Sequence, residues 1–358
     1  MRYYHGGGVT EWEVHVTSRS AHKDFGNINY VRGNAHDKEF IISELSRNHY
    51  DVIVDFMNYG YQEFVECHRL FLDNTDHYIF LSSSRVYDAS SCPLIESSPR
   101  LLDATEDEAF LATQRYALRK ARQEDVMCHS GKNNYSIIRP YITYSPTRLQ
   151  LGIYEKEQWL YRVLNDKSLI IRKEILNKKT TLTCGADVST GIYQIMKGKP
   201  IGEAVHIVAE ETMSWKEILD LYADVIFQET GKQMSVYITD SMAEIESLFE
   251  GGYNTKYDRL FDRSFDNTKA QKICGHINYV DMKTGLTDCL HKFIAMWKIH
   301  GNAIFREIMW DYEAMMDRML GISSCTDMMG VKESELYHTT LKDSSLASLE
   351  NRGLVKYM

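Results

Sequence analysis

The chain has 358 residues, of which 44% are hydrophobic and 25% are charged. This composition is ordinary for a globular protein and excludes wholesale disorder, and the length is sufficient for one large domain with a smaller one. The formal net charge of −9 disfavours a broad binding surface for nucleic acid or for an anionic membrane.

The first part of the chain alternates between predicted strands and predicted helices. Alternating or nearly continuous apolar runs predict strands at residues 12–17, 29–31, 51–56, 77–82 and 135–139. Helical spacing of apolar residues predicts helices at residues 38–48, 61–72 and 106–129. Strands that alternate with helices predict an α/β fold built on a doubly wound, parallel, Rossmann-type sheet. We assign residues 1–146 to this dinucleotide-binding domain.

Beyond Pro146 the pattern is less regular. Helices are predicted at residues 154–164 and 187–196, and a strand at residues 206–208. Ser214 is a predicted helix N-cap, because Glu217 stands three residues later as its capping-box partner. We assign residues 147–300 to a smaller substrate domain whose elements return to the main sheet.

Residues 301–358 form a predicted helical C-terminal extension. Apolar residues recur at three- and four-residue steps from Ile304 to Leu320, which predicts a helix of about five turns with one apolar stripe, and Gly321 is its predicted C-cap. We expect the stripe to dock on its own domain or across a homodimer rather than on another partner. Residues 323–358 are expected to be poorly ordered or loosely attached.

The run Gly6-Gly7-Gly8 does not have the context of a phosphate-binding turn. Such a turn follows a strand and opens a helix, whereas here only five residues precede the glycines and a predicted strand follows them. We expect residues 2–4 to end the first helix and residues 5–10 to lead into the second strand, so that roughly 20 residues with the first strand and the phosphate turn are absent. The alternative is that the motif has diverged beyond recognition.

Tyr116 and Lys120 form a Tyr-x-x-x-Lys pair in a predicted helix. Residues at i and i+4 share one helix face, so the lysine ammonium lies near the phenol. The pKa of a free tyrosine is about 10, and a nearby cation favours the phenolate, as proton transfer to and from a sugar hydroxyl requires. A surface tyrosine packed on a lysine stem has the same spacing, so the pair alone is a weak signal.

The sequence around this pair makes it more specific. Upstream, a predicted buried strand ends in Ser82-Ser83-Ser84-Arg85-Val86-Tyr87, and downstream another runs into Arg139-Pro140, with Tyr144-Ser145-Pro146 after it. In this order, the motifs resemble those of the extended short-chain dehydrogenase/reductase family of nucleotide-sugar epimerases and dehydratases. The resemblance covers about residues 11–295.

The resemblance implies roles for individual residues. Ser83 would be the catalytic hydroxyl, Tyr116 the acid/base, and Lys120 would hold the nicotinamide ribose and tune Tyr116. The cofactor would be NAD or NADP, contacted by Arg19, Asn34, Asp37, Phe56, Met57, Tyr116, Lys120 and Pro140. The substrate would contact Ser83 and Ser84, and its diphosphate would suit the guanidinium forks of Arg148, Arg162 and Arg259.

The family's dehydratases carry an Asp-Glu pair directly after the strand-end Ser or Thr. This chain has Ser84 and Arg85 there, so the resemblance implies an NAD(P)-dependent epimerase acting on a small-molecule nucleotide sugar, as a homodimer. The alternatives are an NAD(P)-dependent carbonyl reductase and a catalytically inactive relative that binds a dinucleotide or a partner protein. An RNA-associated relative is disfavoured by the net charge, so no nucleic-acid partner is expected.

The seven cysteines are spread singly along the chain without a Cys-x-x-Cys pair. The sequence therefore predicts neither a disulfide framework nor a metal site. No apolar run approaches the ~20 residues of a membrane-spanning helix, and no signal-peptide core stands at the N-terminus. We expect a cytoplasmic protein that does not bind membranes.

Overall fold

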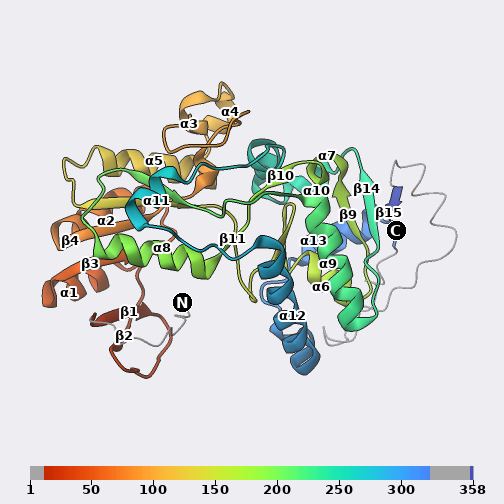
Figure 1. Cartoon of the computed structure of the whole chain (residues 1–358), viewed down its shortest axis with the longest axis horizontal. Helices are drawn as coiled ribbons and strands as arrows, with labels where there is room; N and C mark the ends of the chain where they lie inside the picture. Colours follow the sequence, from red (N-terminus) through yellow and green to blue (C-terminus); the bar gives the residue numbers. More distant parts are fainter. Residues whose placement is uncertain (1–11, 323–354, 358) are drawn as a thin grey trace.

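The computed structural model describes residues 12–322 and 355–357 (Figure 1). Its central sheet has four parallel strands in the order β12-β5-β4-β3. These strands are β3 (Tyr50–Asp55), β4 (Thr75–Leu81), β5 (Tyr135–Pro140) and β12 (Ala204–Ile207). The predicted parallel sheet is thereby confirmed, and each strand lies within about two residues of its predicted position.

Helices cover both faces of this sheet, as expected of a doubly wound fold. One face packs on α1 (Lys38–Arg47), α2 (Tyr61–Asp73) and α5 (Tyr116–Cys128), and the other on α8 (Gly185–Lys197) and α11 (Thr268–Cys274). Phe80 and Ile137 enter the first core, whereas their chain neighbours Ile79 and Ile138 enter the second. Because successive strand residues point to opposite faces, burial on both sides requires nearly continuous apolar runs.

The strands β1 (Val14–Ser18) and β2 (Ile28–Arg32) form a separate parallel pair. Nδ1 of His15 in β1 lies 2.9 Å from the hydroxyl of Tyr50 at the start of β3. Within residues 12–322, however, no strand is hydrogen-bonded between β1 and β3. The expectations for residues 2–4 and 5–10 fall outside the described residues.

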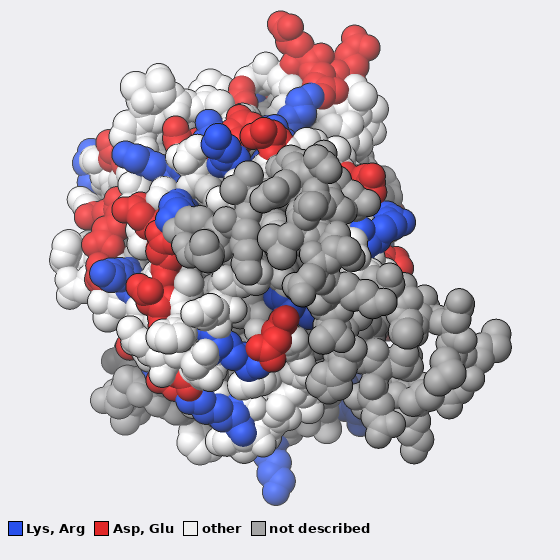
Figure 2. Space-filling view, turned by 90° about the vertical axis from the view of Figure 1, so that its right-hand side faces the viewer, with Lys and Arg blue, Asp and Glu red and all other residues white. Residues whose placement is uncertain are grey.

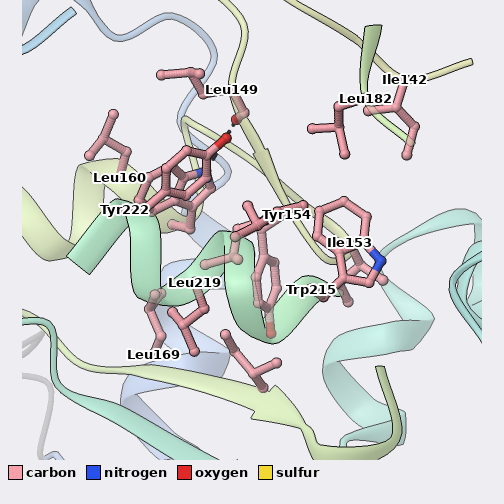
Figure 3. Close-up of a cluster of buried hydrophobic side chains, with 14 of the residues drawn as sticks. Ile142, Leu149, Ile153, Tyr154, Leu160, Leu169, Leu182, Trp215, Leu219 and Tyr222 are labelled. Carbon is pink, nitrogen blue, oxygen red and sulfur yellow. Dashed lines mark hydrogen bonds between the residues drawn. The ribbon is translucent and has the colours of Figure 1, made fainter. Parts of the chain in front are cut away.

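The second part of the chain builds a larger apolar core around a short sheet. The sheet has the order β15-β14-β9, with β9 (Leu169–Arg172), β14 (Val236–Thr239) and β15 (Val355–Tyr357). The helices α6 (Trp159–Leu164), α9 (Trp215–Thr230), α12 (Met282–His300) and α13 (Trp310–Met319) contribute to this core. Figure 3 shows Tyr154, Trp215 and Tyr222 in this core. The ring of Tyr222 stacks on Trp159 at 4.7 Å between centroids.

Short elements connect these parts. The helices among them are α3 (Leu101–Ala104), α4 (Glu108–Leu111), α7 (Lys173–Leu176) and α10 (Ala243–Ser247). The strands are β6 (Thr143–Tyr144), β7 (Gln150–Leu151), β8 (Tyr154–Glu155), β10 (Lys179–Thr180), β11 (Thr183–Cys184) and β13 (Met213–Ser214). The single helical turns are η1 (Ser84–Val86), η2 (Glu250–Gly252), η3 (Thr255–Arg259) and η4 (Gly301–Ile304).

The predicted helix over residues 106–129 is interrupted in the structure, which has α4 and α5 instead. Asp107 caps α4 by accepting the backbone N–H of Phe110 at 3.0 Å. Phe110 stacks on Tyr257 with 4.2 Å between ring centroids, and Arg122 donates to two carbonyls of the intervening turn. These contacts stabilise the interruption between α4 and α5. Local helical spacing cannot predict it, because the stacking partner Tyr257 is distant in the sequence.

One other predicted helix also differs. Residues 154–164 begin as strand β8, and helix α6 starts only at Trp159, because Tyr154 is held by a hydrogen bond from its hydroxyl to the carbonyl of Ile170 at 2.6 Å. By contrast, the capping box before α9 is present. Ser214 Oγ accepts the N–H of Glu217 at 3.1 Å, and the Glu217 carboxylate accepts the N–H of Ser214 at 2.7 Å.

The C-terminal extension packs on its own chain. Helix α13 is shorter than predicted, and Gly321 follows it with φ of 70°. Tyr312, Met316 and Leu320 are buried in the larger core. Most of the stretch from residue 323 onward lies outside the described residues, but residues 355–357 form β15 against β14.

The described surface carries charges of both signs. In Figure 2, acidic and basic side chains are interspersed on the described part of the face shown. No helix among the described residues has the length and apolar character that crossing a bilayer requires.

Candidate active site

The candidate catalytic residues meet at the carboxyl end of β4, where doubly wound folds bind ligands. Ser83 follows β4 and is 6% exposed, and its Oγ accepts the backbone N–H of Arg85 at 3.2 Å. Tyr116 is the first residue of α5, which packs on the η1 turn after Ser83. The guanidinium carbon of Arg85 lies 5.3 Å from the centroid of the Tyr116 ring. Arg85 therefore links the two residues that the sequence placed 33 positions apart.

Lys120 lies one turn after Tyr116 but is directed inward. Its side chain is buried, and Nζ donates to the carbonyl of Leu81 at 2.7 Å and lies 4.7 Å from the ring centroid of Phe80. Burial lowers the pKa of Lys120 to about 8, and the nearby Asp55 opposes this shift. The amine is thus poised to change charge within the range in which enzymes work.

This shift predicts a pH-dependent contribution to stability. Between pH 8 and pH 10 the folded protein releases the Lys120 proton while the unfolded chain keeps it, so stability rises with pH. Because one pKa unit corresponds to about 1.4 kcal/mol, Lys120→Met should remove a rise of about 2 kcal/mol over this interval. Urea unfolding of both proteins at several pH values measures the difference. Lys132→Met, which removes a half-exposed lysine paired with Asp73, should leave the pH profile unchanged.

A buried network behind the site was not predicted from the sequence. Glu124, on α5, is 1% exposed and accepts from Ser82 Oγ at 2.5 Å and from Nε and Nη2 of Arg139 at 2.8 and 2.7 Å. Ser82 precedes Ser83, and Arg139 precedes Pro140. Glu124 therefore fixes α5 against the ends of β4 and β5. The one signal in the sequence is its i+4 spacing from Lys120.

Asp55 ends β3 near Lys120 and is also buried. It accepts from the hydroxyl of Tyr78 at 2.5 Å and from the N–H of Met57 at 2.8 Å, and burial raises its pKa. The predicted cofactor residues Phe56 and Met57 follow directly, and Phe56 is 44% exposed. The structure thus places them at the same sheet edge as Lys120.

The other predicted cofactor residues lie at three strand ends. Arg19 is exposed directly after β1, and Pro140 ends β5. Asn34 and Asp37 follow β2, and both bond to nearby backbone: the Asn34 side chain accepts the N–H of His36 at 3.2 Å, and Asp37 caps α1 by accepting the N–H of Glu39 at 3.0 Å. These hydrogen bonds account for the orientation of both side chains, so neither orientation requires a bound ligand.

The predicted substrate residues are not brought together. Ser84 is fully buried, and its hydroxyl donates to the carbonyl of Arg139 at 2.8 Å. Arg162 is fully buried in ion pairs with α13. Arg259 is 3% exposed, bonded to the carbonyl of Gly152 and paired with Asp258. Arg148 alone of the three arginines has an exposed guanidinium, paired with Glu155 at 3.2 Å. The structure therefore does not fit a diphosphate site shared by these arginines, because Arg162 and Arg259 are buried and already paired with carboxylates of the protein.

The residues present fit one end of a nicotinamide dinucleotide. Ser83 and Tyr116 lie at one sheet edge, where the nicotinamide-ribose end is predicted to bind, whereas Nζ of Lys120 is turned inward to the carbonyl of Leu81. The pyrophosphate requires backbone N–H groups at a helix N-terminus. Within residues 12–322, β1 leads into β2 without a helix, and the carboxylates of Asp37 and Glu63 occupy the N-termini of α1 and α2. The described residues therefore do not provide a pyrophosphate cradle.

Metal ligands do not cluster in the described structure. Among residues 12–322 no three His, Cys, Asp or Glu side chains lie close enough together to hold an ion.

Comparison with known proteins shows a likeness in structure alone. No family model matches the sequence, and no curated protein matches it. Among solved structures, the chain is similar to the enzyme WbmH of Bordetella bronchiseptica in complex with NAD+, with 13% identity and a TM-score of 0.57 over 81% of this chain and 91% of that one.

Two further solved structures show the same likeness. UDP-glucuronic acid 4-epimerase of Bacillus cereus, with UDP-glucuronic acid and NAD, has 17% identity and a TM-score of 0.56, covering 76% of this chain and 83% of that one. dTDP-glucose 4,6-dehydratase of Bacillus anthracis, with NAD, has 16% identity and a TM-score of 0.57, covering 77% and 83%. The chain therefore has the fold of the nucleotide-sugar epimerases and dehydratases of the extended short-chain dehydrogenase/reductase family, to which its motifs pointed.

Proposed function

We propose that this protein is an NAD(P)-dependent epimerase of a nucleotide sugar. The observation that supports the proposal is that α5, which begins at Tyr116, packs on the η1 turn directly after Ser83 at the carboxyl end of β4, with Lys120 one helical turn further along α5. The fold supports it, since the similar solved structures include NAD-bound epimerases. The absence of carboxylates at positions 84 and 85 disfavours elimination of water.

In this proposal the side chains act on one sugar hydroxyl. Tyr116 accepts the hydroxyl proton as the substrate is oxidised to a ketone. After the ketone has rotated, Tyr116 returns the proton as the ketone is reduced on its opposite face. Ser83 donates a hydrogen bond to the same oxygen. Lys120, one helical turn after Tyr116, is anchored to the carbonyl of Leu81, and Glu124 fixes α5 to Ser82 beside Ser83. A bound nicotinamide would accept and return the hydride.

The exchange of Tyr116 for phenylalanine tests this assignment. Tyr116→Phe removes the phenol hydroxyl and leaves the neighbouring packing intact, so turnover should fall ~10²-fold or more with little change in NAD(P) affinity. Lys120→Ala should lower both. Steady-state kinetics and cofactor titration measure the two effects. Full activity of Tyr116→Phe on the true substrate would exclude this residue as the acid/base.

A catalytically inactive, ligand-binding relative is the second candidate. It is favoured by the inward direction of Lys120 and by the lack of a pyrophosphate cradle in the described residues. Without those backbone donors, we expect the 358-residue chain to bind NAD(P) more weakly than ~0.1 mM, or about 5 kcal/mol. Calorimetric titration measures this affinity. A micromolar dissociation constant would show that another part of the chain binds the pyrophosphate and would favour the epimerase.

A further inference from the structure

Three arginines surround one buried carboxylate next to the candidate active site. Asp258, whose side chain is 2% exposed, lies 3.3 Å from Nε of Arg85 and 3.2 Å from Nε of Arg263, and it also pairs with Arg259. Arg259 and Arg263 are further fixed by backbone carbonyls. Arg85 differs from them, because 17% of its side chain remains exposed.

One carboxylate cannot balance three guanidinium charges. Burial, together with the charge of the neighbouring Arg85, lowers the pKa of Arg259 to about 10, and the same two causes lower the pKa of Arg263. Like charges in a region of low dielectric are costly unless an anion compensates them. Glu250 supplies this anion: Nη2 of Arg85 donates to Oε2 of Glu250 at 3.1 Å, and the same nitrogen also donates to the amide oxygen of Asn254 at 3.0 Å.

Glu250 is held in an unfavourable backbone conformation. Its φ is 55°, in the left-handed region that a non-glycine residue adopts at a cost of order 1 kcal/mol, and Gly251 and Gly252 continue the turn at 68° and 84°. The Glu250 side chain is 28% exposed, and a Cβ on Gly252 would meet no atom within 4 Å. A Cβ on Gly251 would instead lie 3.0 Å from Nη2 of Arg115, so the turn is open at Gly252 and in contact at Gly251. The two glycines allow the turn to change conformation.

Arg85 also contacts the residues proposed to react with the substrate. Its guanidinium carbon lies 5.3 Å from the Tyr116 ring centroid, within the range of a cation–π contact, and its backbone N–H bonds to Ser83. An anion bound by Arg85 would thus lie beside the hydroxyl on which Tyr116 acts, which places it on the sugar rather than on the diphosphate.

We propose that Arg85 binds a carboxylate on the sugar of the substrate and that Glu250 occupies its place in the free protein. The substrate is then a nucleotide sugar of the uronic acid class, and the η2 turn moves away when it binds. This inference rests on the proposed function, because it takes Tyr116 to be the group that acts on the sugar.

The test compares UDP-glucuronate, UDP-glucose and UDP as probes, by calorimetry on the full chain. The wild type should bind UDP-glucuronate at least tenfold more tightly than UDP-glucose. Arg85→Gln should bring the two affinities within twofold, chiefly by weakening UDP-glucuronate, and Arg85→Lys should restore part of the preference. Glu250→Gln should tighten UDP-glucuronate severalfold, because the internal competitor has lost its charge. Arg119→Gln is the matched control, since its guanidinium carbon lies 5.8 Å from the same ring outside the cluster, and it should keep the preference.

The outcomes separate this inference from the proposed function. Equal affinity for the two sugar nucleotides in the wild type would overturn the inference and leave the epimerase proposal standing. A preference that persists in Arg85→Gln, or an affinity for UDP equal to that for UDP-glucuronate, would show that Arg85 does not recognise the sugar carboxylate and would overturn the inference as well. Failure to bind any of the three, together with no protection of residues 249–254 from hydrogen exchange by free D-glucuronate, would overturn both.

Discussion

Removal of residues 301–358 should yield a protein that aggregates. The deletion removes Tyr312, Met316 and Leu320 from the larger core and exposes the apolar side chains that they cover. Each of the three contributes about 1.5–3 kcal/mol when buried. It also removes the two carboxylates that pair with buried cations: Arg162 lies 2.9 Å from Glu313 and 2.6 Å from Asp317. Lys167 lies 3.1 and 3.2 Å from the same two carboxylates.

An unpaired buried charge costs about 3–5 kcal/mol, so the combined loss rivals the 5–15 kcal/mol by which domains are stable. Light scattering and thermal melting of the truncated protein measure the effect. A chain that ends after Ile322 keeps α13 and loses only β15 of the described elements, so it should remain in solution and lose much less stability than the 301–358 deletion. A chain of residues 1–300 with unchanged melting temperature and oligomeric state would show that α13 is an independent appendage.

The second large effect is expected for Glu124→Leu. This change leaves Arg139, which is 5% exposed, without its carboxylate and removes the acceptor of Ser82. We expect a loss of about 3–5 kcal/mol in the free energy of unfolding. Activity should fall further than stability explains, because α5 carries Tyr116 and loses its fixation to the ends of β4 and β5.

The double variant Glu124→Leu with Arg139→Met separates these causes. It removes both charges, so most of the stability should return. Arg318→Gln is the control for an ion pair in water: its side chain is 68% exposed beside Glu244, and it should change stability by less than about 1 kcal/mol. Urea unfolding measures all four proteins. A double variant as unstable as Glu124→Leu would show that shape and packing, rather than the unpaired charge, account for the loss.

The sequence predicted those features that depend on neighbouring residues. The parallel strands β4 and β5 are continuous apolar runs because both sheet faces are covered, and the box of Ser214 and Glu217 caps α9 because its two hydrogen bonds join residues three apart. Ser83 and Tyr116 are 33 positions apart, and their shared site was predicted from the resemblance of the ordered motifs to a known family rather than from local spacing.

Contacts between distant residues decided what the sequence could not show. The break before α5 depends on the stacking of Phe110 on Tyr257, and no local pattern records a partner so far along the chain. The roles of the arginines depend on burial as well. Arginine is a residue type that often binds phosphate. In this fold, however, Arg162 and Arg259 form ion pairs with carboxylates of the protein itself.

The sequence by itself thus determined the α/β class, the order of strands and helices and the residues at the end of β4, because periodicity and short-range spacing encode them. Only the tertiary structure decided that Lys120 points inward, that Glu124 fixes α5, and that Arg85 joins Tyr116 to the turn of Glu250. The physical reason is that a side chain's charge partner is set by which distant segments pack together, and in a buried site this partner fixes what the side chain can do.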